Sequence, residues 1–273
     1  MRPAYIIVAH DAPNLLIRLV DDLGDGPIAI HVDKKSEMFD TVKSALGDRA
    51  NITFLPRHLC HWGRFGPVAA AIEGMRWFVR TDADYAILLS GMCFPIRSQA
   101  VIRAQLGQLA GRSMMEHFAF PIPQWSGPDR GGYARIERYF VRIPGRKRPV
   151  KLPFLKRKAL AGFHPFGGSF YWCLSRAAVE QALQTIDEKP WLVVYFKSTY
   201  IPDEMFFQTV LMNSPAAPMI DNKLIHYLDW SARGTGPAVI GRDDIPAVAA
   251  SDALFVRKVQ DTAVMQALAE SRP

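Results

Sequence analysis

The chain has 273 residues, 49% hydrophobic and 22% charged, which is the balance of a soluble globular protein with a substantial core. Lys and Arg outnumber Asp and Glu by 33 to 26, and the resulting net charge of +7 suits an anionic ligand or a membrane surface. The 3 cysteines include no C-x-x-C pair, which argues against a disulfide framework and against a thiolate zinc site.

The N-terminal half alternates short apolar runs with amphipathic segments. Residues 5–9 form a continuous β-branched run that ends in polar residues, which predicts a buried strand. Residues 14–23 carry apolar side chains at a helical period. The alternation continues with predicted strands at 27–32, 52–55 and 85–89 and predicted helices at 37–46 and 68–79. Repeated β-α-β units predict an α/β fold with a mainly parallel central sheet flanked by helices.

No stretch reaches the roughly 20 apolar residues that a membrane-spanning helix needs. The run at 5–9 is too short for a signal peptide and ends at His10 and Asp11. Given the cysteine usage as well, we expect a chain without a transmembrane segment and a cytoplasmic location.

The second half is less regular. Residues 120–165 contain many Pro, Gly and basic residues, which predicts a long loop or an insertion over the sheet. A turn at 167–169 leads into a predicted strand at 170–174, followed by a helix that ends at Leu183. Pro202 is expected to begin a helix over 203–213.

Much of the positive charge lies within residues 142–158. A solvated basic loop is the ordinary interpretation of such a run, and peripheral contact with a membrane is an alternative. No nucleic-acid recognition module accompanies the charges, so we expect no nucleic-acid partner.

Four polar segments follow the predicted strands. In an open parallel sheet, ligands bind beyond the carboxyl ends of the strands, so these segments are expected to surround a ligand. Asp33 could accept hydrogen bonds from a ribose or a base, although Asp is also common in turns and caps. Trp62 could form an aromatic wall, or it could serve packing alone. The segments are residues 10–11, 33–36, 57–63 and 90–93.

Two further groups suit glycosyl transfer. A sugar hydroxyl is a poor nucleophile, and Glu204, at an expected helix N-terminus, could act as an ionised general base, while Asp203 is assigned to structure. Arg257 and Lys258 could neutralise a departing diphosphate. Taken alone, the acids could be ordinary first-turn residues and the cations a solvated pair.

A metal is not expected. Asp82-Ala83-Asp84 matches an Asp-x-Asp pattern, but it precedes the predicted strand at 85–89 and therefore lies at the sheet edge opposite the ligand crevice. Residues 90–93, at the correct edge, lack the oxygen-rich side chains that Mg²⁺ or Mn²⁺ prefers. We expect no metal site and no cofactor.

Five motifs occur in an order that resembles the core-2/I-branching β-1,6-N-acetylglucosaminyltransferase family, which also includes the peptide O-xylosyltransferases. The likeness covers nearly the whole chain. The motifs are Ala-Tyr-Ile-Ile-Val-Ala-His at 4–10, His-Val-Asp-Lys-Lys-Ser at 31–36, Ile-Leu-Leu-Ser-Gly-Met-Cys-Phe-Pro-Ile at 87–96, Pro-Asp-Glu-Met-Phe-Phe-Gln-Thr at 202–209 and Leu-Phe-Val-Arg-Lys at 254–258.

The resemblance implies a GT-A-like glycosyltransferase fold and an inverting enzyme that uses a UDP-sugar without a metal. It implies one domain over residues 1–273, with a nucleotide-binding half (1–115) and an acceptor and catalytic half (116–273). It also implies roles for individual residues: Glu204 as the catalytic base; Val8, Asp33, Cys60, His61, Trp62, Thr235, Arg257 and Lys258 in UDP-sugar binding; and Glu116, Ser169 and Trp230 as weaker candidates for acceptor contact.

Departures from the family pattern bear on the donor. Cys93 stands where many relatives carry an acid, and Phe170 occupies a position that can be acidic in xylosyltransferases, which weakens a claim for xylose. His226 replaces a basic residue that is frequent in relatives. We therefore expect transfer of N-acetylglucosamine to a carbohydrate-type hydroxyl acceptor. UDP-xylose as donor, a non-catalytic nucleotide-sugar or glycan-binding protein, and a metal-dependent transferase are the alternatives.

Overall fold

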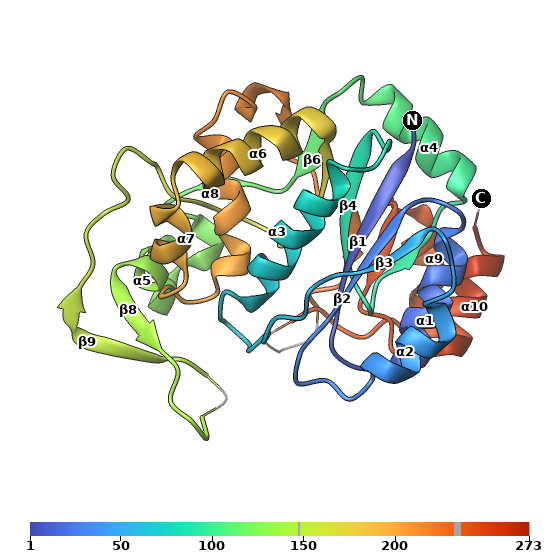
Figure 1. Ribbon diagram of the computed structural model, residues 1–273, viewed down its shortest axis with the longest axis horizontal. Helices are drawn as coiled ribbons and strands as arrows, with labels where there is room; N and C mark the ends of the chain where they lie inside the picture. The colour runs from blue at the N-terminus through green and yellow to red at the C-terminus, as the bar shows by residue number, and fades with distance from the viewer. Residues whose placement is uncertain (147, 232–235, 273) are drawn as a thin grey trace.

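A seven-stranded sheet forms the centre of the computed structural model, which describes residues 1–146, 148–231 and 236–272. Its strand order is β12-β6-β11-β4-β1-β2-β3. Of these strands, β6, β4, β1, β2 and β3 are labelled in Figure 1. The strands are β1 (Pro3–Ala9), β2 (Ile28–Val32), β3 (Ile52–Phe54), β4 (Tyr85–Ser90), β6 (Ser113–Met115), β11 (Trp172–Ser175) and β12 (Ile220–Asp221).

The sheet is mainly parallel. β1 pairs in parallel with β2 and with β4, β2 with β3, and β12 with β6. β11 is antiparallel to both of its neighbours, β4 and β6. This arrangement confirms the predicted α/β fold with a mainly parallel central sheet flanked by helices.

Two apolar layers cover the sheet because successive strand residues point to opposite faces. In β1, Ala4 and Ile6 pack against α3 (Gly66–Phe78), α6 (Arg176–Glu188), α7 (Trp191–Phe196) and α8 (Phe206–Met212). Tyr5 and Ile7 face the other layer, with α1 (Pro13–Leu23), α2 (Phe39–Leu46) and α4 (Gln99–Gln108). The β1 strand is therefore buried on both sides, as its continuous apolar run predicts.

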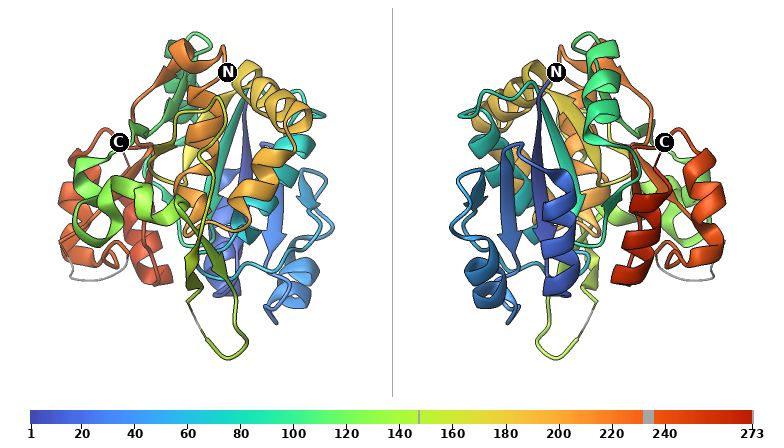
Figure 2. Two further views of the ribbon diagram at one scale, coloured as in Figure 1. Left: turned by 90° about the vertical axis from the view of Figure 1, so that its left-hand side faces the viewer. Right: turned by 90° about the vertical axis from the view of Figure 1, so that its right-hand side faces the viewer.

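A smaller three-stranded sheet brings the C-terminal segment back to the N-terminal half. Its order is β13 (His226–Leu228), β14 (Phe255–Arg257) and β5 (Phe94–Pro95). α9 (Ile245–Ala250) and α10 (Thr262–Glu270) cover this sheet, and α10 lies beside α1 (Figure 2). This packing carries Arg257 from the C-terminal region to the end of β4.

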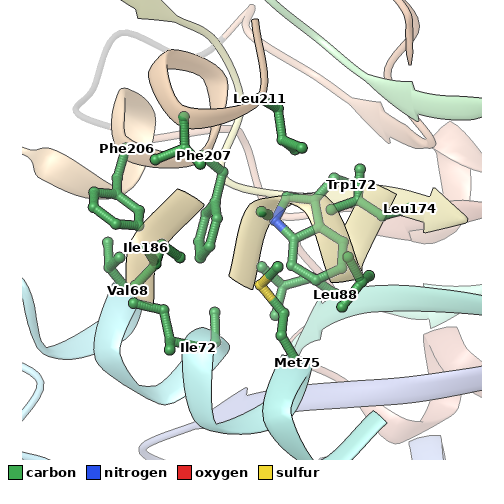
Figure 3. Packing of buried hydrophobic residues seen from close by; sticks show 14 of the residues in the cluster. Val68, Ile72, Met75, Leu88, Trp172, Leu174, Ile186, Phe206, Phe207 and Leu211 are labelled. Carbon is green, nitrogen blue, oxygen red and sulfur yellow. The ribbon is translucent and has the colours of Figure 1, made fainter. Parts of the chain in front are cut away.

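The α8 helix is fixed by its aromatic residues. Phe206 and Phe207 are fully buried against α3, α6 and β11 (Figure 3). The Phe207 ring meets Trp172 of β11 edge to face, with 5.7 Å between ring centroids. The residues just before α8 are thereby held at a defined place on the sheet.

The helix predicted over 203–213 is partly wrong. Pro202–Glu204 form a 3-10 turn, Met205 leaves helical geometry with φ −138°, and α8 begins only at Phe206. Glu204 therefore does not begin an α-helix, and the expected effect of a helix N-terminus on its charge has no structural basis here.

The long loop expected at 120–165 contains more regular structure than predicted. Short helical turns occupy η1 (Pro123–Trp125), η2 (Gly127–Gly132) and α5 (Tyr133–Ile136). They are followed by an antiparallel hairpin of β8 (Arg138–Val141) and β9 (Val150–Lys156), which projects from the body of the molecule in Figure 1. A further pair, β7 (Phe118–Ala119) and β10 (Phe166–Gly167), closes this region.

Across the part of the chain that the structure describes, none of the helices has both the length and the apolar character to cross a membrane.

Candidate active site

A cavity of about 370 Å³ lies at the carboxyl ends of β1, β2 and β4. All four polar segments expected around a ligand contribute to its lining. It is lined by Val8, Ala9, His10, Asp11, Lys35, Cys60, His61, Trp62, Gly63, Pro67, Ser90, Gly91, Met92, Phe170, Tyr171, Asp203 and Arg257.

Five of the residues expected to contact the UDP-sugar line this cavity together. Val8 forms part of the floor at the end of β1, and Arg257 enters from the end of β14. Cys60, His61 and Trp62 come from the loop between β3 and α3, and the Trp62 side chain is 44% exposed at the rim. Segments about 250 residues apart in sequence therefore share one cavity.

Asp33 is not among the described residues that line the cavity. It is fully buried, and its Oδ1 accepts hydrogen bonds from the backbone N–H groups of Lys35, at 3.1 Å, and Cys60, at 3.2 Å. Its other oxygen lies 3.2 Å from Nζ of Lys35. Asp33 thus connects the turn after β2 to the loop that contains Cys60, which is the turn role named as its alternative. Of Asp33 and Lys35, only Lys35 lines the cavity.

The loop that carries Cys60 and Trp62 lies close against the start of α3. A Cβ atom at Gly66 would come within 2.1 Å of the Leu59 carbonyl oxygen, so this contact requires glycine. Burial, followed by the charge of Asp33, raises the pKa of the Cys60 thiol to about 12. Cys60 is therefore a neutral wall residue rather than a nucleophile.

Arg257 is held in place by Tyr171, just before β11, and by Ser90 at the end of β4. Its guanidinium lies over the Tyr171 ring, 5.1 Å from the centroid, and its Nε is 3.4 Å from Oγ of Ser90. The neighbouring Lys258 is not among the described residues that line the cavity, and its carbonyl accepts a hydrogen bond from Ile240. Arg257 is therefore the member of the pair that is placed to meet an anionic ligand.

Asp203 also lines the cavity, although the sequence suggested a structural role. Burial and the nearby charge of Glu204 raise the pKa of Asp203 to about 7. Its Oδ1 is enclosed and has no hydrogen-bond partner among the described residues. Arg257 and Arg135 oppose the increase in pKa, so Asp203 lies within electrostatic reach of both Glu204 and Arg257.

Glu204 points toward a buried arginine. Its Oε2 accepts a hydrogen bond of 2.6 Å from Nη1 of Arg135, which is only 8% exposed, whereas the Glu204 side chain is 37% exposed. Arg135 also binds Asp129 and lies under the Trp125 ring, with 3.8 Å to the centroid. This buried cation holds the Glu204 carboxylate in a fixed position through a charge-assisted hydrogen bond.

Two of the expected acceptor residues lie next to Glu204. Burial raises the pKa of Glu116, a hydrogen bond from the Ser169 backbone lowers it, and the charge of Glu204 raises it further. The backbone N–H of Gly168 donates to the Glu204 carbonyl at 2.9 Å. Glu116, Ser169 and Glu204 therefore form one cluster beyond the described lining of the cavity.

Two expected site residues remain to be placed. Trp230 is 63% exposed and follows β13, whose Leu228 pairs with Arg257. Thr235, and the Gly234 beside it, lie outside the described residues.

Sequence reasoning missed several cavity and support residues. Lys35 and Tyr171 were within recognised segments but were not singled out. Arg135 lies in the 120–165 region, where no periodic pattern marks it, and its role depends on a fold that brings it to Glu204. No local sequence pattern points to Arg135, because its partner Glu204 is 69 positions away.

The Asp-x-Asp pattern lies at the edge opposite the cavity, as expected. Asp82 forms an ion pair with the Arg2 side chain, and Asp84 accepts a hydrogen bond from the Arg2 backbone N–H at the start of β1. Among the residues that the structure describes, no cluster of three or more His, Cys, Asp or Glu side chains could hold a metal ion.

Two mammalian proteins are similar to this chain in sequence. Xylosyltransferase 2 of Rattus norvegicus is 25% identical over 245 residues, covering 85% of this chain and 27% of the relative. The β-1,3-galactosyl-O-glycosyl-glycoprotein β-1,6-N-acetylglucosaminyltransferase 4 of Mus musculus is 28% identical over 232 residues, covering 79% of this chain and 48% of the relative. The chain thus spans about a quarter and about half of these proteins.

Among solved structures, residues 1–349 of TarS from S. aureus, in complex with UDP, match 99% of this chain and 65% of that chain at 9% identity, with a TM-score of 0.46. The family model described as "Branch: Core-2/I-Branching enzyme" matches residues 4–250. This match extends over most of the chain, so the chain belongs to the Core-2/I-Branching enzyme family.

Proposed function

We propose that this protein is an inverting, metal-independent glycosyltransferase that transfers a sugar, with N-acetylglucosamine as the expected one, from a UDP-sugar to a hydroxyl acceptor. The observation that carries the proposal is the cavity at the carboxyl edge of the sheet. Its walls combine Trp62, Arg257 and Asp203, and Glu204 lies directly beside Asp203. Membership of the Core-2/I-Branching enzyme family supports the same activity.

In this proposal the UDP moiety occupies the cavity. Val8 and the Cys60–Trp62 loop contact the uridine, and Arg257 binds the diphosphate with its forked guanidinium. Lys35 adds a cation at the same cavity, and Lys258 acts at longer range. Fixed cations near the leaving group stabilise the charge that develops on UDP and can replace a divalent ion in that role.

The chemistry is a single displacement. Glu204 accepts the proton of the acceptor hydroxyl, and the hydroxyl oxygen attacks the anomeric carbon from the side opposite UDP. A new carbon–oxygen bond forms while the bond from the anomeric carbon to the diphosphate oxygen breaks. UDP leaves with the electron pair towards Arg257, and the anomeric configuration inverts.

Asp203 is a second candidate for the base. It lines the cavity, and its pKa of about 7 is close to the value at which a general base works efficiently at neutral pH. Glu204 is favoured because its side chain is 37% exposed, whereas Oδ1 of Asp203 is enclosed, and because it adjoins Glu116 and Ser169, the proposed acceptor side. Replacing each acid separately distinguishes the two.

The test is a panel of UDP-sugars offered to the purified full chain, with and without EDTA. We expect UDP and UDP-N-acetylglucosamine to raise the melting temperature and UDP release to persist in EDTA. Faster turnover of UDP-xylose would reassign the donor. Binding without turnover across a broad hydroxyl acceptor panel would identify a binding protein instead. Activity that disappears in EDTA and returns with Mn²⁺ would contradict metal independence.

A further inference from the structure

The β8–β9 hairpin and its flanks, residues 138–158, form the most strongly charged segment of the chain. It contains nine Lys and Arg residues and no Asp or Glu, and the next acid is Glu180. These positive charges exceed the net charge of +7 of the whole chain, so the remainder is slightly acidic. The excess charge of the protein is therefore concentrated on one element.

Exposed apolar side chains occur on this same element. Phe154 is 93% exposed, the highest value among the exposed large hydrophobic residues, and Leu155 is 55% exposed. Ile143 and Tyr139 are also exposed. The described residues thus present Phe, Leu and Ile side chains to solvent among cations, without a covering element for Phe154.

The base of the hairpin is firmly attached to the body. Phe140 stacks on Tyr200 with 5.1 Å between ring centroids, and its backbone N–H donates to the Ser198 carbonyl. Arg157, at the other end, lies 3.7 Å from the centroid of the Tyr195 ring and donates to the Tyr195 carbonyl. The hairpin is therefore presented outward as a fixed element, as Figures 1 and 2 show.

We propose that the β8–β9 hairpin docks the protein onto a membrane surface that contains anionic lipids. Basic side chains attract anionic headgroups, and exposed Phe and Leu side chains can enter the boundary between headgroups and acyl chains. A nucleic acid would use the cations and an aromatic ring, but it offers no apolar layer for Leu155 and Ile143. The combination on this hairpin fits a lipid surface best.

Docking in this way would bring the cavity to the membrane. Arg148 of the hairpin lies 5.2 Å from the centroid of the Trp62 ring, and Trp62 is at the rim of the cavity. A sugar acceptor held at the lipid surface would thus lie near the cavity mouth. The docking itself does not depend on which sugar the protein transfers.

The experiment measures co-sedimentation of the full chain with vesicles of phosphatidylcholine alone or with one-third phosphatidylglycerol. We expect binding to the anionic vesicles, weakened by added salt, and little binding to phosphatidylcholine. Lys151→Gln combined with Lys156→Gln should weaken binding about tenfold or more. Phe154→Ser should also weaken it, while hydrolysis of the donor in solution stays unchanged.

Matched controls separate local from general effects. Lys43→Gln combined with Lys223→Gln removes the same charge from exposed positions elsewhere, and Val239→Ser removes an exposed apolar side chain. These variants should bind like the original chain. Equal loss in the control and hairpin variants would overturn the proposal. Binding of an oligonucleotide in place of vesicles, or self-association through Phe154, would overturn it as well.

Discussion

Two walls of the cavity are built in different ways. One wall consists of the short segments after β1, β2 and β4, all within the first 92 residues. The other contains Asp203 and Arg257, which reach the cavity through an irregular turn and a second sheet. The first wall follows from strand topology, because the carboxyl ends of parallel strands meet at one edge.

The second wall depends on contacts between distant residues. Phe206 and Phe207 hold the turn against the core, and Arg135 fixes the Glu204 carboxylate from a separate segment. The first wall is thus set by secondary structure, whereas the second wall is set by packing and by an ion pair. Substitutions should therefore affect the two walls differently.

The largest expected effect is on the rate. Glu204→Gln keeps the shape of the side chain but cannot accept the proton, so transfer should slow by about 100-fold or more. UDP binding should remain, because Glu204 is not among the described residues lining the cavity. Turnover and UDP affinity, measured on the same preparation, check this expectation.

Glu180→Gln is the matched control for that change, because Glu180 is exposed on α6 and remote from the cavity lining. It should leave the rate unchanged. If Glu204→Gln retained full transfer while Asp203→Asn lost it, the base would be Asp203.

Phe207→Ala tests whether core packing sets the second wall. The ring is fully buried and meets Trp172, so its removal should lower the free energy of unfolding by about 3–5 kcal/mol. Transfer should fall more than UDP affinity, because the carboxylate turn directly precedes this residue. Denaturant unfolding, together with both assays, measures the effect. Equal loss of UDP binding and turnover would show that Phe207 supports both walls of the cavity and not the second wall alone.

A comparison of the two adjacent cations sharpens the description of the donor side. Arg257→Ala should weaken UDP binding about 10- to 100-fold, since hydrogen bonds to charged groups contribute about 1.5–3 kcal/mol. Lys258→Ala should have a smaller effect, because this side chain is not among the described cavity-lining residues. Calorimetric titration with UDP compares the variants. A larger loss with Lys258→Ala would reverse the assignment.

The smallest effect concerns the pH dependence of stability. Burial and Glu204 raise the pKa of Asp203 from 3.8 to about 7, so the folded protein holds this proton more tightly than the unfolded chain does. The resulting contribution to stability is present at acidic pH and is lost as the pH rises through about 7.

Asp203→Asn removes this titration. The melting temperature of the original chain should therefore fall relative to that of Asp203→Asn as the pH rises from about 4 to about 7, between the unfolded and folded pKa values, and the difference should be constant above about pH 8. Thermal unfolding at several pH values measures the difference. A constant difference across this range would show that Asp203 does not titrate there.

The strands and helices of the N-terminal half could be predicted from the sequence for a physical reason. Continuous apolar runs predict strands buried on both faces, and the helices between them carry one apolar face, so the order and ends of these elements follow from local pattern. The segments after the strands, including residues 57–63, could then be placed around a ligand. Asp33 is not among the described cavity-lining residues, because its carboxylate accepts hydrogen bonds from the backbone of its own turn and of Cys60.

The second half was less predictable. Pro202 predicted the start of a helix, yet in the folded protein the helical geometry is interrupted at Met205, so Pro202–Glu204 form a separate 3-10 turn. The β8–β9 hairpin lies in a stretch where Pro, Gly and charges obscure any period of two, although pairing makes it regular. Local preference was overridden here by contacts that the sequence does not show.

The amino-acid sequence alone was enough to predict the α/β order of elements, the edge of the sheet where the cavity lies, and the family likeness carried by five short motifs. Tertiary structure decided which residues meet there. Arg257 reaches Ser90 through a second sheet, and Arg135 reaches Glu204 from a region without pattern. The reason is that periodicity encodes which face of an element is buried, whereas a pairing between distant side chains exists only after the chain has folded.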